Sequence, residues 1–362
     1  MDARLESLVE RCPAWLAGGG PDADVVVASR VRLARNLAAR RFPHLLPVEE
    51  AREVCRQGRE RLAPLFGDGA VLEIGSLSAP ERELLAERSL ASRDLLDAQR
   101  PTLLFFNPAE TLGLMVNEED HFRLQSLAPG LDLSAAHKAI RPLSRLISRS
   151  FDLAVHPRFG YLTACPTNAG TGLRASLLLH LPALARAKTP LQNALQTAQR
   201  SYLAVRGLHG EGSRAMGHLY QISNQRTLGT DVTEQMQAVA DFGRQVAEYE
   251  RKIRGVLLNE PSNRRTLGED VQRAWRVLAD SRRLTTIQAL EALSTLRLAA
   301  LGGADAELGL ELNPSRVLWQ FFQMQPGHLQ ARVGAELDPD ARDQSRARLL
   351  REALGIPHPE GT

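Results

Sequence analysis

The sequence Cys-Pro-Thr-Asn-Ala-Gly-Thr-Gly-Leu-Arg, at positions 165–174, decides how the rest of the chain is interpreted. It combines one thiol, two glycines and a final arginine. Glycine lets backbone N–H groups approach a ligand closely, and N–H groups that point into one concavity bind an anion. No lysine follows the glycines as in a Walker loop, so the segment is not a P-loop. Taken alone, it fits an anion-binding turn as well as a polar turn with a buried cysteine.

Several arginines elsewhere in the chain suit the phosphates of a nucleotide. They are Arg30, Arg32, Arg123 and Arg206, and Arg174 at the end of the quoted stretch joins them. A guanidinium pairs with phosphate oxygens through two parallel hydrogen bonds and stays charged at any working pH. Phosphoryl transfer needs chiefly alignment and charge stabilisation, which an arginine clamp with Mg²⁺ supplies. No group of carboxylates forms an obvious metal cage, so no residue is assigned as a metal ligand, and Mg²⁺ would be held by the phosphates and water.

Two glutamates, Glu119 and Glu211, suit a cationic acceptor. A guanidinium has a pKa of roughly 12.5–13.8 and is a poor nucleophile until it loses a proton. Two carboxylates can orient it and accept that proton, and a thiolate at Cys165 would add negative charge beside it. Each residue taken singly has an ordinary explanation, such as a solvated charge at Glu119. Composition and spacing alone therefore indicate only a cytoplasmic α/β protein that can bind an anion.

Composition excludes several other classes of protein. The chain has 362 residues, enough for one large domain and a smaller one, and its dispersed net charge of +3 is no footprint for nucleic acid. Its three cysteines (Cys12, Cys55 and Cys165) form no C-x-x-C pair and suit a reducing compartment. The N-terminus lacks the pattern of a signal peptide, and no apolar run approaches the roughly 18 residues that span a bilayer. We expect a cytoplasmic protein with neither nucleic acid nor membrane as a partner.

Hydrophobic patterning divides the chain near residue 258. The part before it mixes helical periodicity with short apolar runs typical of strands, at 24–29, 102–107, 113–117, 202–205 and 219–223. Three arginines then follow the end of the first run. A long helix is expected from the capping box at Asp231, and residues 131–155 are expected to be helical, kinked or split at Pro142. Everything beyond residue 263 is helical in pattern. The expected domains are therefore 1–257 and 258–362.

Four motifs together resemble those of the ATP:guanido phosphotransferase (phosphagen kinase) family, in the family's order. They are Ser-Arg-Val-Arg-Leu-Ala-Arg-Asn (29–36), Asn-Glu-Glu-Asp-His (117–121), the quoted stretch (165–174) and Arg-Gly-x-x-Gly-Glu (206–211). The resemblance covers about residues 22–255. Within the family, the chain is most similar to the bacterial protein-arginine kinases. The further marks are Glu-Gly-Ser (211–213), Tyr-Gln-Ile-Ser-Asn-Gln (220–225), a C-terminal rather than an N-terminal helical domain, and Arg-Asp-Gln-Ser-Arg-Ala (342–347).

This resemblance implies an α+β fold, with a phosphagen-kinase catalytic domain (an antiparallel sheet flanked by helices) followed by an all-helical C-terminal domain. It implies that ATP is held by Ser29, Arg30, Arg32, Arg123, Arg174 and Arg206. Glu119 and Glu211 would grip and deprotonate the acceptor guanidinium, with Cys165 beside it. In the C-terminal domain, Arg342, Asp343 and Arg346 would form a phosphoarginine-binding motif. Two departures from the family pattern, Ser89 in place of histidine and Ser144-Arg145 in place of acidic residues, are expected to affect nucleotide and acceptor binding.

The activity implied is transfer of the γ-phosphoryl of ATP to arginine side chains of proteins. Relatives hand the marked proteins to a Clp-type protease, control stress regulators or repressors, and partner with a zinc-binding activator, and a homodimer through the C-terminal domain is expected. Two alternatives stay open. One is a kinase for a small guanidino compound such as free arginine, and the other is a catalytically weak adaptor that only reads phosphoarginine.

Overall fold

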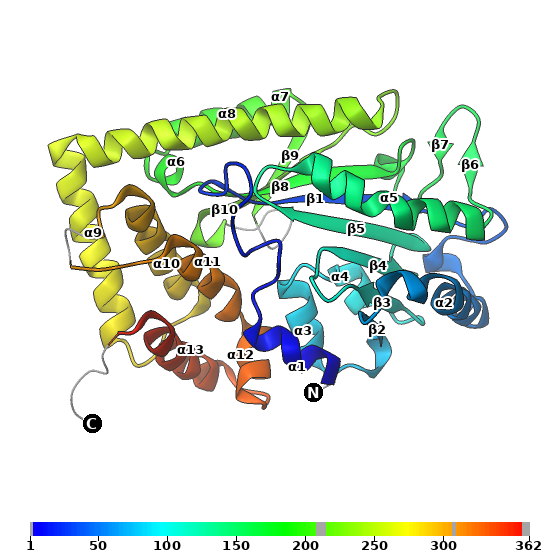
Figure 1. Cartoon of the computed structure of the whole chain (residues 1–362), viewed down its shortest axis with the longest axis horizontal. Helices are drawn as coiled ribbons and strands as arrows, with labels where there is room; N and C mark the ends of the chain where they lie inside the picture. Colours follow the sequence, from blue (N-terminus) through cyan, green and yellow to red (C-terminus); the bar gives the residue numbers. More distant parts are fainter. Residues whose placement is uncertain (1–2, 208–214, 306–308, 357–362) are drawn as a thin grey trace.

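An antiparallel sheet organises the computed structural model, which describes residues 3–207, 215–305 and 309–356. Eight strands of the described part follow the order β2-β3-β4-β5-β1-β8-β10-β9, and β6 and β7 form a separate hairpin that projects from one end (Figure 1). The strands are β1 (Val26–Arg35), β2 (Ala70–Glu73), β3 (Leu103–Phe106), β4 (Leu112–Val116), β5 (Phe122–Pro129), β6 (Val155–His156), β7 (Gly160–Tyr161), β8 (Leu173–His180), β9 (Leu203–Gly207) and β10 (Leu219–Asn224).

Helices surround the sheet and make up nearly all of the last hundred described residues. They are α1 (Ala3–Glu10), α2 (Val48–Leu62), α3 (Ala79–Glu87), α4 (Arg93–Leu96), α5 (Leu133–Ser150), α6 (Pro182–Arg186), α7 (Thr189–Arg200), α8 (Val232–Asn259), α9 (Pro261–Asp280), α10 (Thr286–Gly302), α11 (Pro314–Gln323), α12 (Pro326–Val333) and α13 (Pro339–Leu354). The family resemblance therefore gave the right fold class.

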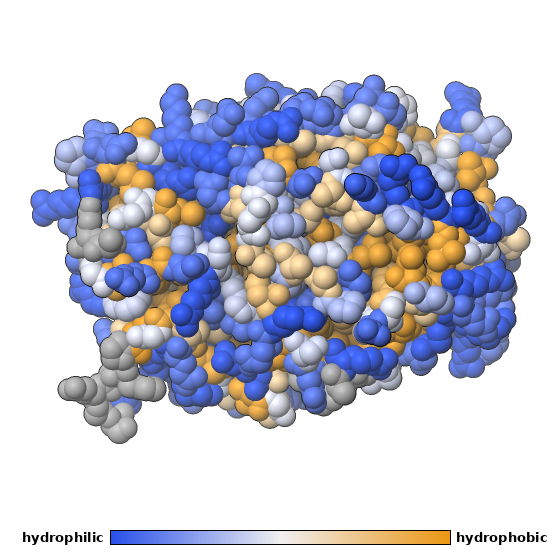
Figure 2. All heavy atoms as spheres, in the orientation of Figure 1, coloured by the Kyte–Doolittle hydropathy of each residue, from blue (hydrophilic) through white to orange (hydrophobic). Residues whose placement is uncertain are grey.

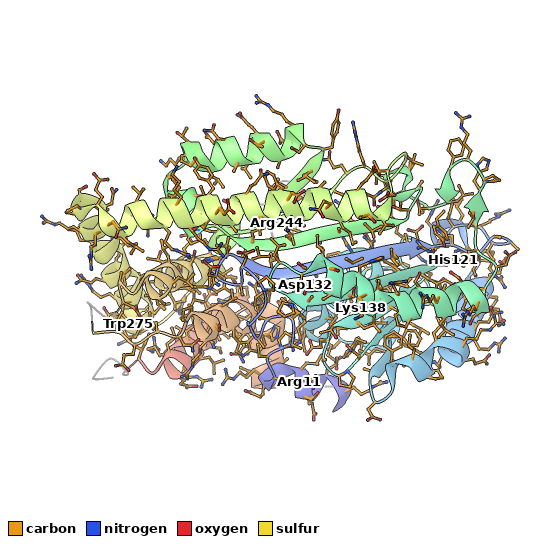
Figure 3. The ribbon with its side chains drawn as sticks, turned by 45° about the horizontal axis from the view of Figure 1, so that its top comes forward. Arg11, His121, Asp132, Lys138, Arg244 and Trp275 are labelled. Carbon is orange, nitrogen blue, oxygen red and sulfur yellow. The ribbon has the colours of Figure 1, made fainter. Side chains whose placement is uncertain are left out.

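One face of the sheet is covered by α5 and α8. Alternate strand residues such as Val31, Leu124 and Leu177 point to this face and form one apolar core with the helices. The capping box expected at the start of α8 is present, because the Asp231 carboxylate accepts a hydrogen bond from Glu234 N (2.8 Å). Figure 3 shows α5, with Asp132 and Lys138, beside α8, with Arg244. The outer side of α8 is hydrophilic along the upper edge of the molecule (Figure 2).

The C-terminal helices share a core with the sheet. Trp15, Leu127 and Leu219 pack in the same cluster as Leu290 of α10 and Phe322 of α11. The long helix α8 ends at Asn259, next to the expected boundary at residue 258, and α9 starts only two residues later. The C-terminal helices are thus packed on the part of the chain that forms the sheet and are not joined to it only by a linker.

Some elements differ from the sequence-based expectation. The first strand runs to Arg35, so Arg30 and Arg32 lie inside β1 and not beyond its end. Strands β5 and β8, which flank β1 at the centre of the sheet, were not expected at all. Helix α5 continues through Pro142, whose ring lies on the exposed side of the helix, where loss of one backbone hydrogen bond is tolerated.

Candidate active site

All five expected nucleotide-binding arginines lie on the face of the sheet opposite α5 and α8. Arg32 of β1 pairs directly with Arg174 of β8, and Arg30 is two residues away on the same strand. Arg123 of β5 lies opposite Ala34 of β1, two residues beyond Arg32. Arg206 of β9 pairs with Gln221 of β10, which continues the same face. Because directly paired residues and every second residue share a face, residues far apart in the sequence form one cationic surface.

In this arginine cradle, the group Arg30, Arg32, Arg123, Arg174 and Arg206, the environment disfavours the charged forms of Arg30 and Arg32. Burial, followed by the nearby charges of Arg123 and Arg174, lowers the pKa of Arg30 to about 10. Burial and the neighbouring arginines lower the pKa of Arg32 well below its usual value. Arg32 Nε is buried without a hydrogen-bond partner among the described residues. A bound polyanion would relieve this repulsion and satisfy the free donor.

A cavity of about 340 Å³ opens in front of the cradle. Arg30, Arg32 and Arg206 line it from the sheet, and Ser89 and Ser92 line it from the segment between α3 and α4. Ser89, the expected departure from the family pattern, therefore faces the same space as the arginines. The segment is tied to the sheet, since Gln125 Nε2 donates to Ser89 O (2.8 Å).

Glu119 lies at the edge of the cradle beside Arg123. Its Oε2 is 3.7 Å from Arg123 Nη1, and its side chain is 33% exposed. Burial raises the pKa of the Glu119 carboxyl above its usual range, in keeping with a group that accepts a proton. Sequence reasoning missed the neighbouring Glu118, which is fully buried and pairs with Arg123 at 2.6 and 2.7 Å. Glu118 holds Arg123 in place, and the partly exposed Glu119 remains accessible to a ligand.

Asp120 joins the two segments that carry Glu119 and Cys165. Its Oδ1 accepts hydrogen bonds from Ala164 N (2.8 Å) and from Asn36 Nδ2 (2.5 Å). The residue that follows Glu119 thus contacts the residue that precedes Cys165. His121, the next residue, lies near the end of the sheet from which the β6–β7 hairpin projects (Figure 3). These contacts tie the segment that carries Glu119 to the start of the cysteine loop.

The cysteine loop is rigidly built. Tyr161 and Gly170 exchange two backbone hydrogen bonds across its base (2.9 and 3.1 Å). Gly170 has a φ of +102°, and a Cβ there would lie 2.4 Å from Thr227 O, so only glycine fits. The partly exposed Cys165 has its Sγ 2.9 Å from Thr167 Oγ1. The glycines predicted to allow close backbone approach thus serve to pack the loop and position the thiol.

Comparison with known proteins identifies the family. The model of the ATP:guanido phosphotransferase C-terminal catalytic domain matches residues 53–253, more than half of the chain. The chain belongs to the ATP:guanido phosphotransferase family. A second model, the protein-arginine kinase McsB C-terminal domain, matches residues 264–362. The resemblance inferred from the four motifs is thereby confirmed.

Relatives of this family match nearly the whole chain. The protein-arginine kinase of Moorella thermoacetica is 38% identical over 353 residues, which cover 96% of this chain and 98% of the relative. That of Brevibacillus brevis is 36% identical over 346 residues, or 94% and 95% of the two chains. Among solved structures, lombricine kinase has a TM-score of 0.56 and 26% identity over 65% of this chain and 68% of its own. A duplicated taurocyamine kinase from Schistosoma mansoni, bound to transition-state analogue components, has a TM-score of 0.58 and 25% identity over 75% of this chain and 40% of its own.

One residue expected at the nucleotide site, Ser29, does not face the arginine cradle. Ser29 points to the opposite face of the sheet, where its buried hydroxyl donates to Gly130 O (2.8 Å) and accepts from Asp132 N (2.9 Å). Its role is to connect β1 to the start of α5, so the assignment to ATP binding is corrected. Glu211 lies outside the described residues. The Ser144-Arg145 departure is on α5, behind the sheet as seen from the cavity.

The expected phosphoarginine motif is placed on α13, and its second arginine is buried. Arg346 is only 1% exposed, and its guanidinium donates to Met324 O (2.9 Å), to Leu284 O (2.6 Å) and to Asp343 (2.5 Å). In this arrangement Arg346 joins three C-terminal segments through its Nε and Nη1. Arg342 and Asp343 are only partly buried.

The described residues contain neither a cluster of side chains suited to bind a metal ion nor a helix suited to span a membrane. The described ranges contain no group of three or more His, Cys, Asp or Glu residues that could bind a metal ion. None of the helices in those ranges combines the length and apolarity that a membrane crossing requires.

Proposed function

We propose that this chain transfers the γ-phosphoryl group of ATP to arginine side chains of proteins. The observation that carries this proposal is the arginine cradle, which opens on a cavity and has Glu119 beside Arg123 at its edge. Near full-length similarity to protein-arginine kinases supports it.

The cradle fits the phosphates of ATP. Arg30, Arg32 and Arg206 reach the cavity, and Arg123 and Arg174 lie on the same face. Fixed guanidinium groups stabilise charge on the transferred group without reorganising during the reaction. Mg²⁺, when bound, would bridge the phosphates and offset their charge, and its other ligands would be water.

The carboxylate end suits the acceptor. Glu119 would hold the arginine guanidinium in position and accept a proton from it, so that a neutral nitrogen attacks the γ-phosphorus while the bond to the β–γ bridging oxygen breaks and ADP leaves. Cys165 would stabilise the positive charge that develops on the guanidino group as the P–N bond forms. Glu211 is proposed as the second carboxylate on the strength of its motif.

Protein arginine is favoured over free arginine as the acceptor. The relatives named protein-arginine kinase cover nearly the whole chain, including the C-terminal match at 264–362, whereas the small-molecule kinases match only part of it. The second alternative, a weak adaptor, is disfavoured because Glu119 and Cys165 are present in the family's motifs and Glu119 lies beside Arg123 of the cradle.

Similarity to the protein-arginine kinases also suggests a cellular role and partners for this chain. We propose a cytoplasmic enzyme that marks proteins for a Clp-type protease and controls stress regulators, with a zinc-binding activator as partner. Dimerisation through the C-terminal helices, and a phosphoarginine site at Arg342 and Asp343, complete the proposal.

Incubation of a protein mixture with Mg·ATP, followed by mass spectrometry at neutral pH, tests the activity. Neutral pH matters because the P–N bond of phosphoarginine is acid-labile. We expect phosphoarginine on proteins and none on free arginine. Efficient turnover of free arginine with unmodified protein would replace this proposal by the small-molecule alternative.

A further inference from the structure

The turn between β4 and β5 carries Glu119, and its backbone has an uncommon conformation. The turn begins at Asn117, whose φ is +58°. A residue other than glycine adopts this left-handed conformation rarely and keeps it only where its surroundings hold it. Asn117 N donates to His121 O (3.0 Å), which closes the turn with Glu119 in its middle. The place of the Glu119 carboxylate therefore depends on what holds residues 117–121.

Arg100 holds the backbone of this turn. It lies between α4 and β3, and its Nε donates to Asn117 O (2.9 Å) while its Nη2 donates to Glu118 O. These two carbonyls belong to the two peptide groups that lead into Glu119. A planar guanidinium can bind two successive carbonyls at once, so it fixes the orientation of both peptide groups.

The other contacts of the turn hold its side chains. Asn117 Nδ2 donates to Ala51 O (2.9 Å) on α2 and to Pro101 O (3.0 Å), the residue after Arg100. The Glu118 carboxylate is held by Arg123, as described above. Arg100 is thus the contact that acts on the peptide groups themselves.

Arg100 approaches the turn from outside the nucleotide cavity. It lines a second cavity, of about 810 Å³, together with Cys55 of α2 and Arg82 of α3. It is not among the residues that line the cavity in front of the arginine cradle. Any effect of Arg100 on the reaction must therefore pass through the turn.

We propose that Arg100 is a positioning residue for Glu119: by fixing the two preceding peptide groups, it places the Glu119 carboxylate against the acceptor guanidinium. This inference rests on the proposed role of Glu119 as the base. Without Arg100, the turn can leave its left-handed conformation and Glu119 can move. A displacement of about 1 Å at a catalytic group can lower a rate by about 100-fold.

Arg100→Met tests the inference, because methionine has a similar length and lacks both donors. We expect single-turnover transfer at saturating Mg·ATP to fall about 10- to 100-fold, with ATP affinity unchanged. Arg100→Lys, which can reach one carbonyl, should lose less than Arg100→Met does.

A double-mutant cycle with Glu119→Gln separates positioning from general damage. If Arg100 acts through Glu119, adding Arg100→Met to the Glu119→Gln variant should lower its remaining rate by less than about 2-fold, because the group that Arg100 places is already lost. A merely structural residue would lower the rate by the same factor in both backgrounds.

Arg82→Met is the matched control. Arg82 lines the same second cavity and also donates to two backbone carbonyls, Leu77 O (3.1 Å) and Leu96 O (3.3 Å), but neither belongs to the turn. We expect a comparable change in thermal stability and wild-type transfer.

Amide hydrogen exchange of residues 117–121 examines the turn without any activity. Exchange should be faster in Arg100→Met than in the wild type and unchanged in Arg82→Met. Unchanged exchange, wild-type transfer by Arg100→Met, or an equal loss in both backgrounds of the cycle would each overturn the inference. If Arg100→Met does not fold, Arg100→Lys replaces it in every comparison, with the same criteria.

Failure of the proposed function gives a different result. A wild-type protein that phosphorylates free arginine and leaves protein unmodified would contradict the proposed function alone. The same cycle, run with free arginine as the acceptor, would then still test whether Arg100 acts through Glu119.

Discussion

Arg32 lies directly opposite Arg174 with Arg30 on the same strand, and burial together with these neighbouring positive charges lowers the pKa of Arg32. Glu118 and Glu119 offset part of the positive charge, but Glu118 is already paired with Arg123. Repulsion between these arginines therefore lowers the free energy of unfolding of the ligand-free protein, and binding of a polyanion would remove this repulsion. The cradle thus lowers stability in exchange for binding.

Arg32→Met tests whether this arginine lowers the stability of the ligand-free protein and strengthens ATP binding. Because burial and repulsion already lower the pKa of Arg32, its charged form is disfavoured in the folded protein. A neutral side chain should raise the free energy of unfolding without ligand, by on the order of 1 kcal/mol. The same change should weaken ATP binding about 10- to 100-fold, because it removes charge-assisted hydrogen bonds. Thermal unfolding with and without ATP measures both effects.

Arg265→Met, at an exposed position on α9, is the control and should change neither quantity. A fall in ligand-free stability on Arg32→Met, matched by unchanged ATP affinity, would mean that Arg32 is a structural residue.

Glu119→Gln should preserve ATP binding and slow phosphoryl transfer. The amide keeps the shape of the side chain but can neither accept the proton nor balance the guanidinium charge. Losing one such contact typically lowers the rate by on the order of 10²–10³. Single-turnover transfer and ATP binding are measured separately. Wild-type transfer by the variant would remove Glu119 from the mechanism.

The pH profile gives an independent check on Glu119. Its carboxyl must be ionised to act as a base, and burial raises its pKa. The rate should therefore decline as the pH falls, with a midpoint above the ordinary glutamate value of roughly 4.3.

Cys165 should be the first of the three cysteines to react with iodoacetamide. Burial raises the pKa of Cys12 to about 11 and that of Cys55 to about 12, which keeps both thiols protonated and unreactive. Peptide mapping after brief labelling identifies the modified residue, and ATP with acceptor protein should slow the reaction. Cys165→Ser should lower the transfer rate without a change in thermal stability. Earlier labelling of Cys12 or Cys55 would contradict this assignment.

At the scale of elements, the functional motifs could be predicted from the sequence better than the strands that carry them. Strands β5 and β8 escaped prediction although they flank β1 at the centre of the sheet. Their cavity-facing positions include Arg123, Gln125 and Arg174, where a strand buried on both sides usually has apolar residues. Polar residues that serve the cavity thus removed the hydrophobic signal that marks a central strand.

Contacts between segments far apart in the chain could not be predicted from the sequence either. The link from Asp120 to Ala164 joins segments 44 residues apart, and no local pattern indicates it. Ser29 belongs to the same motif as Arg30 and Arg32, but strand alternation turns its side chain to the other face of the sheet. Likewise, the turn between α11 and α12 faces the cavity only because α12 docks on α3.

Gly327→Ala tests that docking. The added methyl group would meet the backbone of α3, so we expect a loss of about 1–3 kcal/mol in the free energy of unfolding. Gly268→Ala on α9 is the matched control, because no atom lies within 4 Å of its Cβ position. Alanine there should stabilise the helix by roughly 0.5–1 kcal/mol. Urea denaturation of both variants measures the difference, and equal effects would mean that α12 can move away from α3 at little cost.

At the scale of the whole molecule, the C-terminal motif and the cavity in front of the arginine cradle are physically connected. Arg346 of α13 donates to Met324 O (2.9 Å), and the next residue, Gln325, lines the cavity. Asp343 pairs with Arg346, and its backbone carbonyl accepts from Leu284 N (3.0 Å). A ligand that binds Arg342 and Asp343 would therefore be connected to the cavity wall through the contacts of Asp343 with Arg346 and of Arg346 with Met324 O.

We predict that free phosphoarginine and ATP change each other's affinity by the same factor, because coupling between two binding sites is reciprocal. Typical coupling of 1–3 kcal/mol corresponds to roughly 5–150-fold. Calorimetric titration of each ligand, with the other absent or saturating, measures the two factors. Arg342→Ala should abolish phosphoarginine binding and keep ATP binding. Arg348→Ala, at an exposed position on the same helix where Arg348 pairs with Glu352, should change neither. Phosphoarginine binding to Arg342→Ala with wild-type affinity would show that the motif on α13 serves only to pack the C-terminal helices.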